Sequence, residues 1–333
     1  MTPPPVSRAL ITGICGQDGS YLTDRLLAAG WEVHGISHDC GCPDGCVIGD
    51  ALGPAPTVHR VDIADTTALS RIVRQVAPTH VFHLAAVSSV GRSWRDPVLT
   101  AQVNSLATVA LYSTCLDLQE ALGRRVVVLN ACSGEIFAGS GQSPQNEQTR
   151  VAPTSPYGVS KAFGFQMGQV FRVRGLPVSS AILYNHESPR RPDTFVSRKI
   201  TKAVASIATG RTDTLTLGRI DGRRDWGWAP DYVDCMWRMA AREEPDDYVV
   251  ATGVAHSIRD FVIAAFSAAG IEDWQSYVRL DDAMVRPTDP TVMVGDAGKA
   301  QAVLGWRAAA SFDDIVTAMV QHDLGLRPAG RVT

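Results

Sequence analysis

Short apolar, β-branched runs alternate with longer amphipathic stretches over the first two-thirds of the chain. The run SRALITGI at residues 7–14 predicts a strand, and the stretch after it places Leu22, Leu26 and Leu27 on one face of a helix that ends at Gly30. A second strand run follows directly, and the alternation recurs through at least six such runs. This rhythm predicts an α/β fold built on a doubly wound parallel sheet.

Residues 185–210 break this pattern, because they are dense in Arg, Lys and Pro. Strand and helix patterns resume further along the chain. We therefore predict a larger domain, formed by residues 1–184 with about 225–254, and a smaller, interleaved C-terminal domain, formed by residues 185–224 and 255–333.

Composition argues against nucleic-acid-binding, membrane and disulfide-rich proteins. The chain has 333 residues, of which 45% are apolar and 20% are charged, and its formal net charge is -3. A balance this close to neutral does not favour nucleic acid as a partner. The sequence shows neither a basic-then-apolar signal region nor an uncharged apolar run of about 18 residues, so we expect no membrane association and a cytoplasmic location. The seven cysteines are an odd number, which argues against a disulfide framework.

A glycine-rich turn separates the first predicted strand from the first helix. Gly13, Gly16 and Gly19 frame Gln17 and Asp18 in this turn. Glycines allow the backbone to approach a pyrophosphate closely, and the amides of the helix N-terminus meet its charge. Glycine spacing alone also fits an ordinary turn. The strand before it and the helix after it predict a Rossmann dinucleotide site in the larger domain.

Tyr157 and Lys161 stand four residues apart at the start of a helical pattern. This spacing places both on one helical face, where the ammonium favours the phenolate and lowers the pKa of a phenol from its usual value of about 10. Such a tyrosine can take a proton from an alcohol, although an exposed Tyr/Lys pair has the same spacing. Ser133, at the end of a strand run, can hydrogen-bond the same alcohol. Glu135 follows it at the edge of the sheet where ligands bind.

Several blocks of the sequence resemble one enzyme family. The glycine turn, the Tyr-x-x-x-Lys pair and the upstream serine resemble the extended short-chain dehydrogenases/reductases. The blocks NHESPRR (185–191), RRDWGWAPDYV (223–233) and RPTDPTVMVGDAGKAQAVLGW (286–306) are more specific. Together with ALITGICGQDGSYL and SPYGVSK, they resemble the GDP-mannose 4,6-dehydratase family over nearly the whole chain.

This resemblance implies a lyase that converts GDP-mannose, or a close GDP-sugar, into the GDP-4-keto-6-deoxy sugar. Tyr157 would deprotonate the 4-hydroxyl while hydride leaves C4 for a nicotinamide, with Ser133 holding the oxygen and Lys161 keeping the phenolate available. Glu135 would then abstract the acidified C5 proton, water would leave from C6, and hydride would return to C6. The alternative for Glu135 is a structural carboxylate at a helix start.

The resemblance also implies the residues that bind ligands. The cofactor set begins at the glycine turn and includes the Tyr/Lys pair: Gly13, Gly16, Gln17, Asp18, Gly19, Ser37, His38, Asp62, Ile63, Leu84, Ala85, Ala86, Ser88, Tyr157, Lys161, His186 and Arg191. The GDP-sugar set is Ser88, Asn185, Lys199, Arg224 and Arg286, and its three basic residues would hold the two phosphates. For any single basic residue, a solvated surface charge is the alternative.

The sequence departs from the family pattern after the second strand. Ser37, His38 and Asp39, followed by the segment CGCPDGC, stand where the family carries an arginine pair for the 2'-phosphate of NADP and an insertion that helps to build a tetramer. The acidic residue expected for NAD is also absent from its usual place. We expect NADP, with NAD as the alternative, and a homo-oligomer, either a dimer, which we favour, or a tetramer.

Two further features bear on the chemistry. Cys40, Cys42 and Cys46 follow His38, but their spacing does not match the paired C-x-x-C hooks of structural zinc sites, so we predict no metal. Gly134 stands where related dehydratases carry Ser or Asp. The proton for the departing hydroxyl would therefore come from the neighbouring carboxylate or from water.

Two other functions stay open on the sequence alone. A GDP-sugar C4 oxidoreductase or epimerase on the same scaffold would change the sugar without loss of water. A cofactor-sensing binding protein is the second alternative, although a sensor has no need of Ser133, Tyr157 and Lys161 together.

Overall fold

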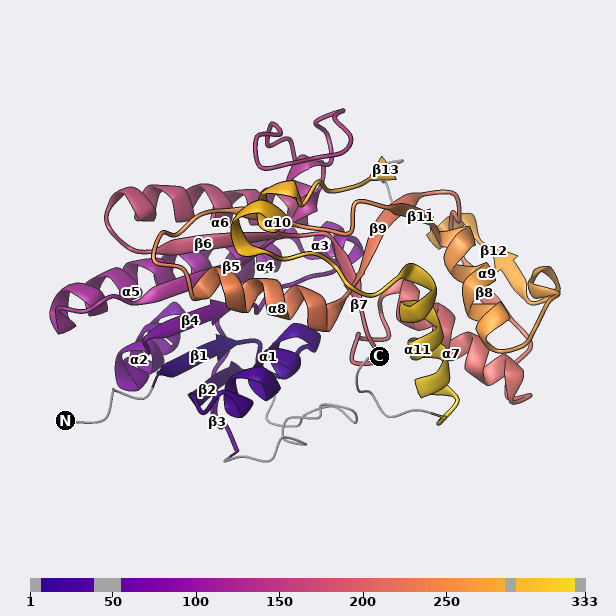
Figure 1. Ribbon diagram of the computed structural model, residues 1–333, viewed down its shortest axis with the longest axis horizontal. Coiled ribbons are helices and arrows are strands. Elements are labelled where there is room, and N and C mark those ends of the chain that lie inside the picture. The colour runs from indigo at the N-terminus through magenta and orange to yellow at the C-terminus, as the bar shows by residue number, and fades with distance from the viewer. Residues whose placement is uncertain (1–6, 39–54, 285–291, 327–333) are drawn as a thin grey trace. The chain divides into compact units, whose positions relative to one another are not determined.

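A seven-stranded parallel sheet forms the centre of the larger of two structural units (Figure 1). The computed structural model describes residues 7–38, 55–284 and 292–326. The strand order is β10-β6-β5-β4-β1-β2-β3, and β1 pairs in parallel with both β2 and β4. The strands are β1 Arg8–Thr12, β2 Glu32–Ser37, β3 Thr57–Arg60, β4 His80–His83, β5 Val127–Ser133, β6 Val178–Leu183 and β10 Tyr248–Val250. The order reverses between β1 and β4, which confirms the doubly wound Rossmann sheet, and ligands bind such sheets at this switch point.

Helices cover both faces of the sheet. On one face α2 packs beside α5, and α6 lies beside α5. On the other face α1 and α8 lie together, because Arg25 pairs with Asp234 at 2.5 Å. The helical segments are α1 Gln17–Ala28, α2 Thr66–Val76, α3 Val90–Arg95, α4 Pro97–Ala101, the π turn η1 Gln102–Leu106, α5 Ala107–Leu122, the short 3-10 turn η2 Gly134–Phe137, α6 Pro156–Val173 and α8 Ala229–Ala240. Among the described residues, no helix is long and apolar enough to span a membrane.

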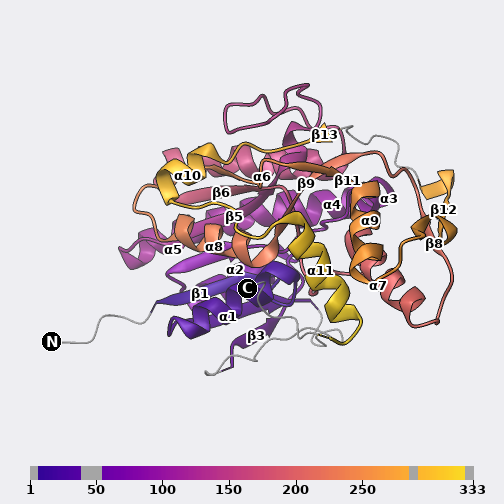
Figure 2. The same ribbon diagram turned by 45° about the vertical axis from the view of Figure 1, so that its right-hand side comes forward.

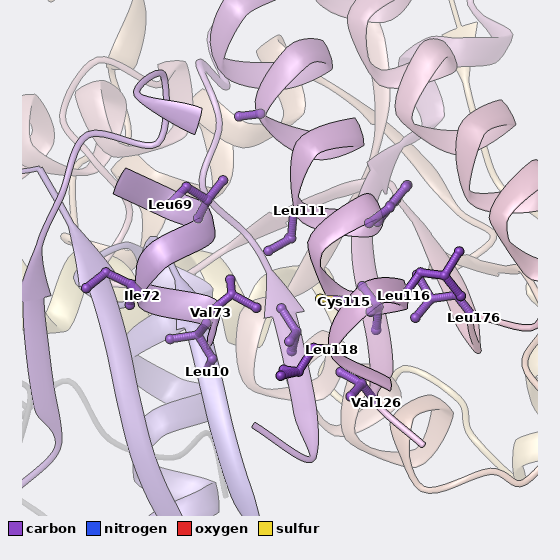
Figure 3. Close-up of a cluster of buried hydrophobic side chains, with 14 of the residues drawn as sticks. Leu10, Leu69, Ile72, Val73, Leu111, Cys115, Leu116, Leu118, Val126 and Leu176 are labelled. Atoms are coloured by element: carbon purple, nitrogen blue, oxygen red, sulfur yellow. The ribbon is translucent and has the colours of Figure 1, made fainter. Parts of the chain in front are cut away.

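The pair α2/α5 buries an aliphatic core against the sheet (Figure 3). Leu69 and Val73 of α2 and Leu111 of α5 have no exposed surface, and Leu10 of β1 lies in the same cluster. Burial of each such side chain contributes about 1.5–3 kcal/mol. This core packs the α2/α5 face of the sheet and holds the strands β1, β4 and β5 in place, so their carboxyl ends form a rigid edge.

The second unit contains a four-stranded sheet, a two-stranded sheet and a layer of helices. The four strands are ordered β11-β9-β13, with β7 also paired to β9. Helices α7, α9 and α11 pack side by side (Figure 2) and bury Ile200, Phe261 and Ile315. The elements are β7 Asn185–Glu187, α7 Val196–Ala208, β8 Leu215–Leu217, β9 Arg223–Trp228, β11 Ala255–Ser257, α9 Ile258–Ala268, η3 Trp274–Ser276, β12 Val278–Leu280, η4 Asp282–Met284, β13 Val292–Met293, α10 Gly298–Leu304 and α11 Phe312–Asp323.

The units divide the chain differently from our predicted domains at several boundaries. Residues 233–248 belong to the first unit, whereas we assigned it about 225–254. For residues 225–232 the reason is β9, which pairs with β7, β11 and β13 of the second unit. Residues 141–149 also belong to the second unit, because the Gln145 amide donates to the Val294 carbonyl at 2.9 Å.

Candidate active site

The turn between β1 and α1 closes only because its key positions are glycines. Gly13 has a φ of +74°, and a Cβ atom on it would lie 2.9 Å from the Cα and N atoms of Ala85. A Cβ on Gly19 would lie 2.3 Å from the Gly13 carbonyl oxygen. The N-cap of α1 is Gly16, which offers no capping side chain. The turn therefore presents bare backbone and a helix N-terminus, the arrangement that suits a pyrophosphate.

A buried polar network fixes the end of β4 beside this turn. The Thr12 hydroxyl accepts hydrogen bonds from the amides of Leu84 and Ala85, both at 3.1 Å. It also bonds His83 Nδ1 at 2.8 Å, and His83 Nε2 bonds Thr108 Oγ1 at 2.9 Å. Burial lowers the pKa of His83 to about 3, so the ring is neutral and bridges the two hydroxyls. The predicted cofactor segment 84–86 thus lies against Gly13.

Tyr157 and Lys161 are both buried on α6, at 8% and 9% exposed, which excludes a solvent-exposed pair. The Lys161 ammonium nitrogen lies 6.0 Å from the centroid of the Tyr157 ring and donates to the Ala131 carbonyl at 2.7 Å. Burial lowers the pKa of Lys161 to about 8, so the group is still mainly charged at neutral pH. A cation held beside a phenol favours the phenolate.

Ser133 and Glu135 come to the same place from the end of β5. Ser133 is buried and caps the short turn η2, because its Oγ accepts the Glu135 amide at 3.3 Å. Glu135 is half-buried. A Cβ on Gly158 would lie 2.8 Å from the Glu135 carbonyl oxygen, so η2 touches the first turn of α6 next to Tyr157. The structure thus gathers all four residues that the sequence predicted for catalysis.

Three further residues, Asn104, Ser160 and Ser93, hydrogen-bond the segments that carry the predicted catalytic residues. Sequence patterns did not indicate them. Asn104 lies in the π turn, a feature often found at functional sites. Its side chain bonds the amide and carbonyl of Val87 at 2.8 and 3.1 Å and donates to Ser160 Oγ at 3.0 Å. Ser93 Oγ accepts the Tyr157 amide at 3.1 Å. A polar residue inside a helix gives no periodic signal; only its burial marks it.

The ends of β2 and β3 also lie together. The Val61 amide donates to the Ser37 carbonyl at 3.0 Å, and the Asp62 carboxylate accepts the Ala64 amide at 2.9 Å. Ile63 is buried, whereas His38 and Ser88 are exposed. Cys40, Cys42 and Cys46 lie outside the described residues.

The second unit carries most of the other predicted ligand residues. Asn185 and His186 lie on β7, and the His186 ring stacks on Tyr232 with centroids 4.7 Å apart. Gly227 makes room for the Tyr232 ring, because a Cβ on Gly227 would lie 2.2 Å from Cε2 of that ring. Arg191 follows β7.

The basic residues predicted for the phosphates differ in their surroundings. Arg224 on β9 is buried and donates to the Arg223 carbonyl at 2.8 Å. Lys199 on α7 is half-buried, with its nitrogen 3.6 Å from the Met284 sulfur. Arg286 lies outside the described residues.

Comparisons with known proteins agree on one family. A sequence profile of that family, described as GDP-mannose 4,6 dehydratase, matches residues 10–319. GDP-mannose 4,6 dehydratase 2 of Arabidopsis thaliana is 40% identical over 98% of this chain and 90% of its own length. A GDP-mannose 4,6-dehydratase of Sordaria araneosa is 39% identical over 97% of this chain, which spans 62% of that relative's length.

Solved structures share the fold. The UDP-glucose 4-epimerase of Thermus thermophilus, in complex with NAD, has a TM-score of 0.80 and 28% identity, and covers 96% of this chain with 99% of its own. RMD from Pseudomonas aeruginosa, complexed with NADPH, has a TM-score of 0.77 and 25% identity, and covers 96% of this chain with 98% of its own.

Proposed function

The chain belongs to the GDP-mannose 4,6-dehydratase family, and we infer that it is a hydro-lyase that converts GDP-mannose, or a close GDP-sugar, into the GDP-4-keto-6-deoxy sugar. The position of Glu135 carries this inference, since its half-buried carboxylate follows Ser133 and lies against the helix of Tyr157 and Lys161. Oxidation at C4 needs only a tyrosine/lysine pair, whereas removal of water also needs a base for the C5 proton.

The protein uses a nicotinamide cofactor, and the glycine turn fits one. A side chain on Gly13 or Gly19 would collide with the chain itself, so both positions require glycine, as the tight turn of a dinucleotide site does. Similar structures hold NADPH in one case and NAD in the other. When bound there, a nicotinamide would supply reversible hydride transfer to and from the hexose.

Tyr157 starts the reaction as a general base. Its phenolate takes the proton of the 4-hydroxyl, and the Ser133 hydroxyl holds the same oxygen. Lys161 keeps the phenolate available, because its ammonium lies 6.0 Å from the ring and is fixed by the Ala131 carbonyl. Ser93 and Ser160 bond the backbone amide and carbonyl of Tyr157, which fixes the first turn of α6 that carries the phenol.

Glu135 acts next. A ketone at C4 acidifies the proton on C5, which the Glu135 carboxylate removes while the hydroxyl leaves C6 as water. Gly134 supplies no side chain to protonate that leaving group. The protonated Glu135 would return its proton to the departing hydroxyl, and a proton from solvent would restore C5 after hydride returns to C6, which would explain how the reaction proceeds with glycine at residue 134.

The second unit supplies the substrate contacts in this proposal. Lys199, Arg224 and Arg286 bind the two phosphates of GDP, with Asn185 and Ser88 on the remainder of the sugar nucleotide. Arginine suits this task because its planar fork forms two bonds to phosphate oxygens. Arg224 already has one nitrogen fixed by a carbonyl, which limits its freedom before the ligand arrives.

We propose NADP as the preferred form of the cofactor. Ser37 ends β2 and His38 follows it, so neither position carries the acidic residue that Rossmann folds selecting NAD place there. His186 and Arg191 complete the proposed set of cofactor-binding residues. Comparison of NADPH and NADH titrations tests the choice, and equal affinities would contradict it.

We also propose a homodimer in the cytoplasm. Val159, Phe163, Val170 and Val173 are exposed on α6 and recur on one helical face. Exposed apolar stripes of this kind mark contact surfaces, and a two-fold dimer would cover both copies at once. Sedimentation of the purified protein tests this proposal, and Val170→Lys should shift it towards monomer.

Mass spectrometry tests the activity itself. Purified protein incubated with GDP-mannose should yield a product that has lost one water, with no added cofactor consumed. A sugar isomerised at C4 without loss of water would instead support an epimerase. Stoichiometric reduction of added cofactor would support a C4 oxidoreductase, and an unchanged sugar would support the cofactor-sensing alternative.

A further inference from the structure

The carboxylate of Glu187 is buried at the end of β7, with 1% of the residue exposed. Ser197 Oγ donates to Glu187 Oε2 at 2.5 Å, and Arg191 Nε lies 3.3 Å from the same oxygen. A buried charge is costly unless it is paired and hydrogen-bonded. Glu187 therefore needs both partners, and it holds both of them in place.

The contact with Arg191 fixes the direction of the guanidinium. Among the described residues, no group hydrogen-bonds Arg191 Nε, so the attraction is one of charge. The guanidinium also lies over the Phe195 ring, 3.7 Å from its centroid. Glu187 on one side and Phe195 on a face leave the arginine little freedom, which reduces the entropy lost when it binds a ligand.

The contact with Ser197 reaches the neighbouring helix. Ser197 lies in the first turn of α7, and the N-cap residue Phe195 provides no capping side chain. A carboxylate at this end also meets the helix dipole favourably. Lys199, proposed above for the substrate phosphates, follows two residues later on α7.

We propose that Glu187 is a positioning residue that sets Arg191 for the cofactor and the first turn of α7 for the GDP moiety. This inference rests on the proposed function, because that function gives Arg191 and Lys199 their ligands. One carboxylate thereby links the two binding segments on either side of residues 188–195. A purely neutralising role for Glu187 makes the opposite prediction, since removal of its charge would strengthen the attraction of Arg191 for phosphate.

Titration of purified variants with NADPH tests the Arg191 half of the proposal. Glu187→Gln should weaken NADPH binding about tenfold, the size of coupling between residues in contact, and should add little in an Arg191→Ala background. Asp193→Asn is the matched control, because Asp193 lies in the same loop but forms an exposed pair with Lys202. It should bind NADPH as the wild type does.

Titration with GDP tests the α7 half. Ser197→Ala keeps the charge of Glu187 but removes its hydrogen bond, and it should weaken GDP binding several-fold while NADPH affinity changes less than about twofold. The proposal is overturned if Glu187→Gln binds NADPH as tightly as the wild type or more tightly, if its effect persists undiminished beside Arg191→Ala, or if Ser197→Ala binds GDP normally. Turnover of GDP-mannose by the wild type is measured in a separate assay. If the wild type shows no loss of water from the sugar, the proposed function fails, but the NADPH and GDP titrations still test the role of Glu187.

Discussion

The two units hold their functional groups by different means. In the first unit, Ser133 and Tyr157 stand at a strand end and a helix start, and uncharged hydrogen bonds between serine hydroxyls and backbone amides fix both places. In the second, buried carboxylates organise the binding segments, as Glu187 does for Arg191. Backbone placement gives a geometry that does not relax, which suits proton transfer. Ion pairs with buried carboxylates suit the recognition of a charged ligand. We therefore expect changes in the first unit to act on kcat and changes in the second to act on binding or stability.

Loss of the phenol should give the largest effect. Tyr157→Phe removes the general base while its ring still packs, so kcat should fall on the order of 10²–10⁴-fold. NADPH binding should stay close to that of the wild type. Stopped assays of water loss, beside NADPH titration, measure the two quantities. A variant that loses both equally would place the tyrosine among the structural residues.

Glu135→Gln should separate the two halves of the reaction. The variant should still bind cofactor and oxidise C4, but it should lose elimination by about 10²-fold or more, because glutamine cannot take the C5 proton. Exchange of the C5 hydrogen with deuterated water should vanish with it. Release of water from the sugar at the normal rate would refute the role of Glu135.

Substitution of Asp225 tests whether a buried carboxylate stabilises the second unit. One oxygen accepts the Thr252 amide at 2.8 Å, and the other accepts the amides of Gly253 at 2.9 Å and Gly295 at 3.3 Å. Burial raises the pKa of Asp225, and these hydrogen bonds oppose the rise. Asp225→Asn turns a donor towards at least one amide, which should lower the free energy of unfolding by about 1–3 kcal/mol. Thermal melts measure this, with the exposed Asp213→Asn as control; equal melting temperatures would contradict it.

The pH dependence should give the mildest effect. Burial lowers the pKa of Lys161 to about 8, so kcat should fall to half near pH 8 as the ammonium is lost. His83 is already neutral at pH 7 and should add no step there. Between pH 8 and the ordinary lysine value of 10.5, the unfolded chain binds more protons than the folded one, so Lys161 makes stability rise with pH. A kcat profile flat to pH 10 would contradict this assignment.

The sequence predicted the parts that obey a period or a fixed spacing. The strand and helix patterns gave the doubly wound sheet, and the i, i+4 spacing of Tyr157 and Lys161 placed both on α6. Those signals exist because strands and helices repeat every 2 and 3.6 residues.

The rest depends on contacts between distant residues. Asn104 is a polar residue in a helical pattern, and Glu187 and Asp225 are charges that would be placed on a surface by default. Their burial follows from pairing that no local pattern contains, such as that of β9 with β7 and β11. For the same reason, residues 225–232 fell on the wrong side of the predicted boundary.

The central claim is that the hexose passes through a ketone at C4 before water leaves. GDP-mannose labelled with deuterium at C4 tests it most directly. The account predicts a dehydrated product that carries the deuterium at C6, with no label in added cofactor. Dehydrated product that keeps its deuterium at C4, or that loses it to solvent or to the added cofactor, would contradict it.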